Sequence, residues 1–314
     1  MTARSARKSS TRRSKFHSLL QIENLPTETI TSLLTLARRM QSGRPRPLLR
    51  GKVIALLFYE ASTRTRVSFE LAAKRLGAMT TLVTASASSI EKGESLVDTV
   101  ATLRAAGADA IVMRHPSSGA PHLVARNFEL PVVNAGDGMH EHPSQALLDA
   151  FTILRHKKKL AGLRVVIVGD ILHSRVARSN VHLLRRFGAQ VMLCGPPELA
   201  PELATSLAPG VNLTPHIDVA VRGADVVMML RVQKERLVGL NVNAEQYVAG
   251  YQLTPERLRL AKRDAIVMHP GPIVRGMELT SEVADSEQSV IVEQVANGVA
   301  VRMAILAWAM GAAR

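Results

Sequence analysis

The sequence predicts an α/β protein made of two doubly wound parallel-sheet domains joined by interdomain helices. Two observations support this fold class. Short β-rich apolar runs alternate with longer helical patterns, and Gly77, Gly107 and Gly188 each follow a helical pattern. Glycine is common just after a helix because it adopts left-handed backbone angles without strain. Strands separated by helices favour parallel pairing, because each parallel connection needs a crossover.

The predicted strands form two groups of four, separated by a basic, glycine-containing stretch at 157–163. The strands are 53–58, 80–83, 110–113 and 132–134, then 164–168, 191–194, 226–229 and 266–268. The helical patterns lie near 64–76, 94–106, 142–157, 175–187, 217–222 and 255–262. We expect one domain at 16–148, with a C-terminal helix at 293–314 packed back on it, and a second domain at 149–292.

Composition limits the cellular setting and the kinds of site. Of 314 residues, 46% are hydrophobic but only 3% are aromatic, so the core must be aliphatic. Cys194 is the single cysteine, so no intrachain disulfide can form and no cysteine-based zinc site exists. This use of cysteine favours a reducing, cytoplasmic location. No apolar run approaches the roughly 20 residues that span a bilayer, so no membrane association is expected.

The net charge of +14 is unevenly distributed. The first fifteen residues carry six basic residues and no acidic one, and without them 34 basic residues face 26 acidic ones, a charge of +8. The segment 1–15 is rich in serine and lacks an apolar stretch, so it is no secretory signal. We predict a basic disordered tail; a transit-like peptide and a nucleic-acid-binding arm are the alternatives. The remaining positive charge fits a protein whose substrates are anions.

The most informative segment is the turn after the strand at 53–58. Ser62, Thr63 and Thr65 offer hydroxyl groups and Arg64 a guanidinium, at the point where a helix begins. The first N–H groups of a helix have no internal partner and carry the positive end of its dipole. The turn therefore predicts a phosphate cradle built without a glycine-rich loop. The alternative is simple helix capping, with the arginines on a solvated surface.

The string Phe58-Tyr59-Glu60-Ala61-Ser62-Thr63-Arg64-Thr65-Arg66-Val67-Ser68-Phe69-Glu70 resembles the carbamoyl-phosphate motif of the aspartate/ornithine carbamoyltransferase family. Six further polar clusters, ending at Gly276, follow in the family's order. The resemblance implies that 16–148 binds carbamoyl phosphate and 149–292 binds aspartate. It implies that carbamoyl phosphate is bound by Ser62, Thr63, Arg64, Thr65, Arg114, His142, Gln145, Pro270, Gly271 and Pro272. Among these it implies catalytic roles for Arg64, Thr65, Arg114 and His142.

The same resemblance assigns the second substrate and a shared active site. It implies that aspartate is bound by Lys92, Arg175, Arg231 and Gln233, and that Ser88 and Lys92 reach into a neighbouring subunit. The protein would then be a homotrimer with shared sites. Without the resemblance, the loop 88–94 would be a mobile surface loop with a capping serine.

Residue spacing disfavours both a zinc site and a dinucleotide site. His140-Glu141-His142 with Asp137 suggests zinc, but histidines two residues apart in a helix point in different directions and no further ligand has suitable spacing. Only Gly169 follows the strand at 164–168, whereas a dinucleotide site needs three spaced glycines. We therefore expect no metal and no cofactor.

The resemblance implies transfer of a carbamoyl group from carbamoyl phosphate to the α-amine of L-aspartate, in de novo pyrimidine biosynthesis. One alternative is an ornithine-type carbamoyltransferase, which Arg-Val-Gln-Lys-Glu-Arg at 231–236 disfavours. The other is a non-catalytic basic subunit that binds a partner or nucleic acid, which the full set of substrate residues disfavours. The His-Pro-Gly-Pro string at 269–272 resembles the branch of the family that associates with a dihydroorotase. No nucleic acid is expected as a partner.

Overall fold

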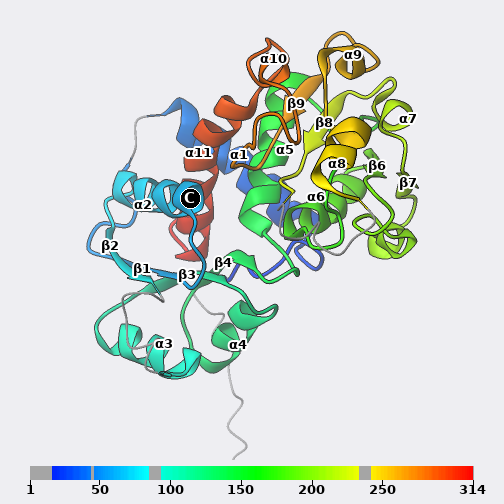
Figure 1. Cartoon of the computed structure of the whole chain (residues 1–314). Coiled ribbons are helices and arrows are strands. Elements are labelled where there is room, and N and C mark those ends of the chain that lie inside the picture. Colours follow the sequence, from blue (N-terminus) through cyan, green and yellow to red (C-terminus); the bar gives the residue numbers. More distant parts are fainter. Residues whose placement is uncertain (1–15, 44–45, 85–92, 233–241, 314) are drawn as a thin grey trace, which may run out of the picture.

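The computed structural model contains two parallel β-sheets with helices packed around them (Figure 1). It describes residues 16–43, 46–84, 93–232 and 242–313. The first sheet has the order β2-β1-β3-β4, with β1 Val53–Phe58, β2 Met79–Thr84, β3 Ala110–His115 and β4 Val132–Asp137. The second has the order β7-β6-β5-β8-β9, with β5 Arg164–Val168, β6 Gln190–Cys194, β7 Asn212–Thr214, β8 Val226–Met229 and β9 Ile266–Met268. The predicted fold class is confirmed.

All eight predicted strands are present, but the second sheet has one more. The additional strand β7 has three residues at the edge of the sheet, and none of them is fully buried. A short, half-exposed edge strand lacks the apolar run that identified the other strands. The prediction of two groups of four strands was therefore wrong by one edge strand.

The helices are α1 Thr27–Ser42, α2 Thr63–Arg75, α3 Leu96–Ala105, α4 Ala120–Asn127, α5 Pro143–Lys157, α6 Arg175–Arg186, α7 Ile217–Val221, α8 Ala244–Tyr251, α9 Pro255–Leu258, α10 Ser281–Ala284 and α11 Ile291–Ala309. A 3-10 helix spans Glu202–Leu207. The helices α1, α4, α8 and α10 were not predicted from the sequence. The signal for α1 was present, since its buried residues Ile30, Leu33, Leu34 and Ala37 follow helical spacing.

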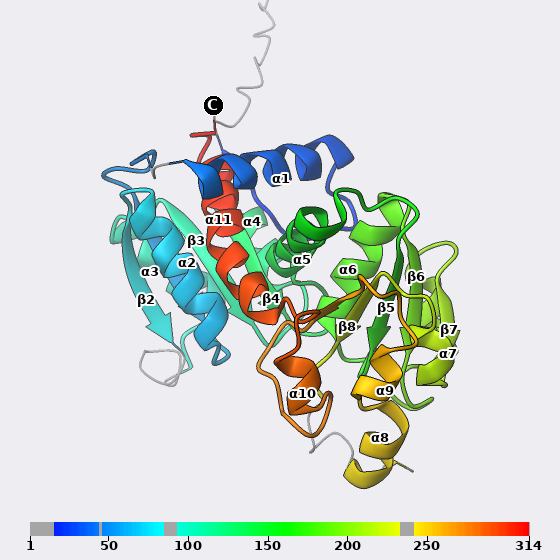
Figure 2. The ribbon, with the colours of Figure 1, turned by 90° about the horizontal axis from the view of Figure 1, so that it is seen from above.

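Two long helices lie between the sheets (Figure 2). α5 follows the last strand of the first sheet and packs against α6 of the second. α11 packs against α1, α2 and α5, so the C-terminal part of the chain returns to the first sheet. The domain limits proposed from the sequence stay a prediction. The two helices give both sheets a common apolar core to which α5 contributes Leu147 and Phe151.

α11 is apolar enough, over its 19 residues, to pass a length-and-composition test for a membrane span. It is, however, 67% buried inside the protein. Its packing against three other helices accounts for this composition, because a helix that is apolar all round belongs in a protein core or a membrane. Among the residues that the structure describes, no other helix passes this test.

The carboxyl ends of the central strands of both sheets point to a common region. In open parallel sheets, ligands bind beyond the carboxyl ends of the strands.

The left-handed backbone of Gly77, with φ of +79°, ends the α2 segment and directs the chain into β2. The predicted role of Gly77, Gly107 and Gly188 after helices is confirmed by positive φ at all three positions.

Candidate active site

A cleft of about 610 Å³ lies where the strand ends of the two sheets meet. Both sheets contribute to it, through the segments that follow β1, β4, β5, β8 and β9 and through the end of β3. Its lining residues are Glu60, Ala61, Ser62, Thr63, Arg64, Thr65, Arg114, Gly138, His142, Gln145, Asp170, His173, Ser174, Arg175, Val176, Leu230, Arg231, Pro270, Gly271 and Pro272.

The N-terminus of α2 lies at this cleft and has features that suit an anion. Ser62 is the N-cap residue of α2, but its side chain makes no capping hydrogen bond. The first turn of α2 contains no acidic residue. Among the described residues nothing caps this end of α2 through the Ser62 side chain, and the first N–H groups of a helix have no partner within it, so both can bind an anion. The phosphate cradle stays a prediction. Arg64 adds a guanidinium that can bind two oxygens at once.

Arg114 and His142 bring two hydrogen-bond donors of different charge. Burial, together with the charge of Arg175, lowers the pKa of Arg114 to about 10, so it stays protonated at neutral pH. Burial, reinforced by Arg114 and Arg175, holds the pKa of His142 well below its usual value. The imidazole is therefore neutral. Its Nδ1 lies 3.4 Å from Ser144 Oγ. If Nδ1 accepts that hydrogen bond, Nε2 carries the proton and can donate to a bound oxygen.

Arg175 is the first residue of α6 and lines the cleft from the side of the second sheet. Its Nη2 donates to Glu60 Oε2 and its Nη1 donates to the carbonyl of Gly138 at 3.2 Å. The same Glu60 oxygen lies 3.1 Å from Arg114 Nε. Ser174 caps α6 by accepting a hydrogen bond from Ala177 N at 3.0 Å. One carboxylate thus orients two guanidinium groups that come from different sheets.

The turn after β9 closes the cleft near the anion site. Gly271 has a φ of +74°, and a Cβ at this position would lie 2.7 Å from Arg64 Nε. His269 Nδ1 accepts a hydrogen bond from Gly271 N at 2.8 Å. Burial and the charges of Arg64 and Arg231 lower the pKa of His269 to about 3, so it is neutral and holds the turn as an acceptor. Because Gly271 has no side chain, the Arg64 guanidinium can lie directly against this turn.

Comparison with known proteins decides the family. The carbamoyl-P binding domain of aspartate/ornithine carbamoyltransferase matches residues 17–155, and the Asp/Orn binding domain of that family matches residues 161–309. The aspartate carbamoyltransferase catalytic subunit of Koribacter versatilis (strain Ellin345) is 65% identical over 292 residues, which cover 93% of this chain and 96% of that protein. The chain belongs to the aspartate/ornithine carbamoyltransferase family.

Solved structures from both branches of this family share the fold. Aspartate transcarbamoylase from Trypanosoma cruzi, in complex with carbamoyl aspartate and phosphate, aligns with a TM-score of 0.85 at 34% identity and covers 94% of this chain and 96% of its own. Ornithine carbamoyltransferase from Pyrococcus furiosus aligns with a TM-score of 0.83 at 30% identity and covers 94% and 97%. Because both branches align almost equally well, the fold of the family does not identify the acceptor amine.

The structure brings together every described residue that the family resemblance assigned to the site. These are Ser62, Thr63, Arg64, Thr65, Arg114, His142, Gln145, Arg175, Arg231, Pro270, Gly271 and Pro272. The other three assigned residues, Ser88, Lys92 and Gln233, lie outside the described residues. The basic segment 1–15 also lies outside them. The functional roles given to all these residues stay predictions.

Three titratable residues of the cleft, Glu60, Asp170 and His173, were not assigned from the sequence. Glu60 pairs with two arginines, and Asp170 accepts hydrogen bonds from His173 N at 3.1 Å and from His173 Nδ1 at 2.9 Å. All three line the cleft. Glu60 lies inside the quoted family motif, and Asp170 and His173 lie between the strand at 164–168 and Arg175. Charged residues directly after a strand were the signal that could have found them.

A buried carboxylate supports the cleft from behind. Glu278 is fully buried and accepts hydrogen bonds from Val232 N at 3.1 Å and Val274 N at 2.9 Å. Burial raises its pKa. Val232 directly follows Arg231, and Val274 lies two residues after Pro272, so Glu278 links the segments that carry both of those cleft residues.

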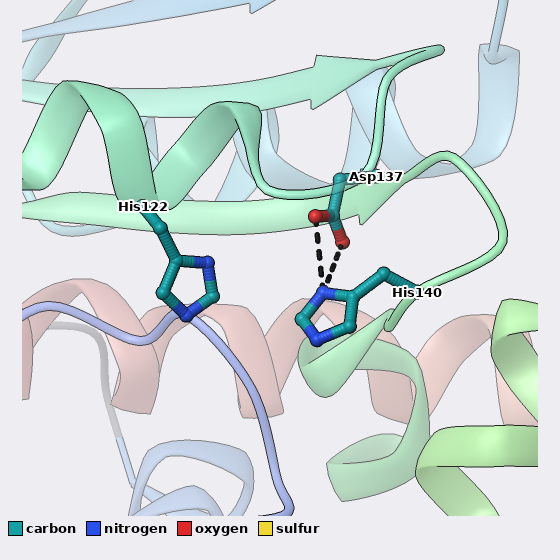
Figure 3. Close-up of side chains that lie close together, drawn as sticks. All are labelled: His122, Asp137 and His140. Carbon is teal, nitrogen blue, oxygen red and sulfur yellow. Dashed lines mark hydrogen bonds and ion pairs between the residues drawn. The ribbon is translucent and has the colours of Figure 1, made fainter.

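Three residues of types that can ligate a metal, His122, Asp137 and His140, lie outside the cleft. Figure 3 shows them side by side. One ligand atom from each lies within 4.8 Å of the others. Sequence spacing did not indicate His122, which lies eighteen positions before His140, but folding places His122 of α4 beside it. Asp137 already accepts hydrogen bonds from Gly119 N at 2.7 Å and Asn134 Nδ2 at 2.7 Å, besides its contact with His140. These contacts make the group a hydrogen-bonded cluster in the structure.

The three residues of the candidate zinc motif, 140–142, make separate contacts in the structure. Glu141 is buried and accepts hydrogen bonds from Ile22 N at 2.7 Å, Glu23 N at 3.0 Å and Ser179 Oγ at 2.7 Å. His142 is the N-cap residue of α5 and lines the cleft, whereas His140 contacts Asp137. The two histidines precede the helix rather than lying within it, so the helical spacing argument did not apply to them.

Proposed function

We propose that the chain is an aspartate carbamoyltransferase that transfers the carbamoyl group of carbamoyl phosphate to the α-amine of L-aspartate, giving N-carbamoyl-L-aspartate and phosphate in pyrimidine biosynthesis. The observation that carries this proposal is the cleft in which the Ser62–Thr65 cradle lies with Arg175 and Arg231. Support also comes from the relatives at 53–65% identity named aspartate carbamoyltransferase catalytic subunit. The cleft offers cations for the phosphate and for two carboxylates.

The proposed mechanism needs no covalent enzyme intermediate. The free α-amine attacks the carbonyl carbon of carbamoyl phosphate and a tetrahedral oxyanion forms. Thr65, Arg114 and neutral His142 donate hydrogen bonds to that oxygen, a contribution that typically gives about 10²–10³ in rate for each donor. The C–O bond to phosphate then breaks, and the leaving phosphate, held by Arg64 and the N-terminus of α2, takes the amine proton. Most of the catalysis is the positioning of two anions that repel each other.

Arg175 and Arg231 account for the choice of acceptor. Two guanidinium groups bind the two carboxylates of aspartate through paired, charge-assisted hydrogen bonds. The side-chain ammonium of ornithine would meet like charge at the same place. This cationic pair favours aspartate over the ornithine-type alternative.

The proposal extends to a homotrimer with shared active sites, in which Ser88 and Lys92 of one subunit complete the site of the next. It is supported by exposed apolar side chains on α2 and on the edge strand β2. These are Val67 at 38%, Leu71 at 42%, Met79 at 61% and Leu82 at 44% exposure. Exposed apolar groups gathered on neighbouring elements are typical of association surfaces. A dihydroorotase partner and a cytoplasmic location complete the proposal and rest on the sequence alone.

A carbamoyl-transfer assay of the purified full chain tests this function. The chain is supplied with carbamoyl phosphate and with either aspartate or ornithine. We expect turnover with aspartate only. Turnover with ornithine only would replace the proposal with the ornithine-type alternative. If neither acceptor reacts, the assay is repeated with added dihydroorotase, and continued inactivity would contradict the proposal.

A further inference from the structure

Asp149 is a fully buried carboxylate directly behind the cleft. It lies on α5, one helical turn after Gln145. Its Oδ1 accepts hydrogen bonds from Gln145 Nε2 at 2.9 Å and Gln294 Nε2 at 2.6 Å, and its Oδ2 accepts from Asn180 Nδ2 at 2.8 Å. Asn180 belongs to α6 and Gln294 to α11. Three amide groups from three helices therefore converge on one carboxylate.

The contact with Asp149 fixes which end of the Gln145 amide faces the cleft. An ionised carboxylate only accepts hydrogen bonds, so the NH2 group of Gln145 must turn toward it. Burial raises the pKa of Asp149 to about 6, against the opposing effect of its hydrogen bonds, so the group is ionised at neutral pH. The buried guanidinium of Arg302, on α11, supports that charge. The Oε1 of Gln145 is thus left for a ligand, as an acceptor.

The same carboxylate also reaches the turn on the other side of the cleft. Gln294 donates to Asp149 through Nε2, and its Oε1 accepts a hydrogen bond from His269 N at 3.1 Å. His269 directly precedes Pro270 and holds Gly271 through its ring. The backbone of this turn offers carbonyl oxygens and, at its two prolines, no N–H groups. Gln145 and the turn at 269–272, which both offer acceptor oxygens to the cleft, are therefore both linked to Asp149 by hydrogen bonds.

We propose that Asp149 is a positioning residue that makes this end of the cleft accept hydrogen bonds, and that the cleft thereby selects an acyl phosphate carrying an NH2 group over one carrying a methyl group. The inference rests on the proposed function, because it assumes that carbamoyl phosphate occupies the cleft. A site with correctly oriented acceptors rejects a ligand that lacks the matching donors, since its polar groups would then stay unpaired.

The test compares equilibrium binding of carbamoyl phosphate and acetyl phosphate to the full chain. Acetyl phosphate replaces the NH2 group by a methyl group and keeps the phosphate. In Asp149→Ala we expect affinity for carbamoyl phosphate to fall about tenfold, the value of about one hydrogen bond, while affinity for acetyl phosphate changes less than about twofold. An equal loss for both ligands would show a merely structural role and overturn the inference.

A matched control is Asp225→Ala in the second sheet. Asp225 is also buried, accepts a hydrogen bond from Arg164 N at 2.9 Å and pairs with Lys262 at 2.7 Å, but neither of these partners lines the cleft, whereas Gln145 does. We expect the ratio of the two affinities to stay at its wild-type value. A fall in this ratio as large as that in Asp149→Ala would mean that the loss reports general loosening of the protein, and would overturn the inference.

A double-mutant cycle shows whether Asp149 acts through Gln145. Gln145→Ala removes the acceptor itself and should lower the affinity ratio. In that background, Asp149→Ala should lower the ratio little further, because coupled residues are not additive. Fully additive losses would contradict the proposed route. If Asp149→Ala does not fold, Asp149→Ser is used, since it removes the carboxylate and adds no bulk.

The outcomes for the wild-type chain separate this inference from the proposed function. A wild-type chain that carbamoylates aspartate but binds both acyl phosphates equally well would overturn the inference alone. A chain that prefers carbamoyl phosphate but transfers nothing to aspartate would overturn the proposed function and leave the binding site for the NH2 group in place.

Discussion

Glu60 and Arg175 form an ion pair across the cleft, joining the segment after β1 of the first sheet to the start of α6 beside the second. The same Glu60 oxygen lies 3.1 Å from Arg114 Nε. Arg114 is proposed to act on carbamoyl phosphate and Arg175 on aspartate. A single carboxylate, whose side chain is 30% exposed, therefore orients one cation for each substrate.

Glu60→Gln should lower kcat/KM for aspartate about tenfold to a hundredfold, because a charge-assisted hydrogen bond to a guanidinium contributes about 1.5–3 kcal/mol. Binding of carbamoyl phosphate should change less, since the cradle at the start of α2 is untouched. Steady-state kinetics with each substrate varied in turn measure both effects. Glu70→Gln is the control, because Glu70 pairs with Lys74 at 2.6 Å away from the cleft. Unchanged kinetics in Glu60→Gln would contradict this role.

Arg231→Ala should raise the KM for aspartate and lower kcat, with a combined loss in kcat/KM of about a hundredfold for a lost charge-assisted contact. Carbamoyl-phosphate affinity should stay near the wild-type value. Arg231→Lys should recover little activity, because an ammonium cannot bind a carboxylate through two parallel hydrogen bonds. If affinity for both substrates fell equally, Arg231 would not be specific to the acceptor.

Mixed trimers test the proposed sharing of sites between subunits. Arg64→Ala and Lys92→Ala chains should each be nearly inactive. If Lys92 acts in the neighbouring subunit's site, a mixture that has exchanged subunits contains some sites free of both changes. Activity should then rise above that of either parent. No recovery in mixtures whose exchange has been verified would argue that each subunit has a complete site of its own.

Gly271→Ala should weaken carbamoyl-phosphate binding. A side chain at φ of +74° costs about 1–2 kcal/mol, and its Cβ would meet the Arg64 guanidinium at 2.7 Å. We expect the KM for carbamoyl phosphate to rise about tenfold through displacement of Arg64. Gly223→Ala has a similar positive φ but nothing within 4 Å of its Cβ, so it should reduce stability without this change in KM. Equal KM values in the two variants would show that Arg64 adapts freely.

The His140–Asp137 contact predicts a pH dependence of stability. The hydrogen bond from His140 to Asp137 raises the pKa of His140, although burial opposes it. The folded protein therefore binds this proton more tightly than the unfolded chain. The contribution of this contact to the free energy of unfolding is complete below the pKa of His140 in the unfolded chain, about 6.5. It is lost as the pH rises through the higher pKa of His140 in the folded protein. Wild type should lose up to about 1 kcal/mol across this window relative to His140→Gln. Denaturant unfolding at fixed protein concentration measures the difference.

Thermal unfolding with added Zn²⁺ distinguishes hydrogen bonding from cation binding in the cluster of His122, Asp137 and His140. One equivalent of Zn²⁺ should leave the melting temperature unchanged if Asp137 stays with His140. A stoichiometric stabilisation that is absent in His122→Ala would show instead that His122, Asp137 and His140 hold a cation.

Much of the fold follows from local sequence. The strands β1, β5, β8 and β9 have the predicted bounds because each is a continuous apolar run, apart from Arg164 at the start of β5, as buried parallel strands are. The edge strand β7 lacks such a run. The polar groups that follow the strands could also be found, since the carboxyl ends of parallel strands meet at one edge and thereby bring Ser62, Arg175 and Arg231 together.

The residues that sequence reasoning missed are those whose partners come from distant segments. Nothing local indicates that Asp149 receives amides from α6 and α11, or that Glu278 holds the backbone after Arg231. His122 and His140 are eighteen positions apart and meet only because α4 packs beside the end of β4. Such contacts depend on how helices pack on the sheets, which residue spacing within one element does not specify.

The most direct test of the proposed function is a crystal structure of the chain with N-(phosphonacetyl)-L-aspartate, which joins a phosphonate to the two carboxylates of aspartate. We expect the phosphonate at the N-terminus of α2 with Ser62, Thr63 and Arg64. We expect the two carboxylates at Arg175 and Arg231, and the central carbonyl oxygen near Arg114 and His142. Carboxylates bound away from both arginines, or a phosphonate outside the α2 cradle, would contradict the proposed function.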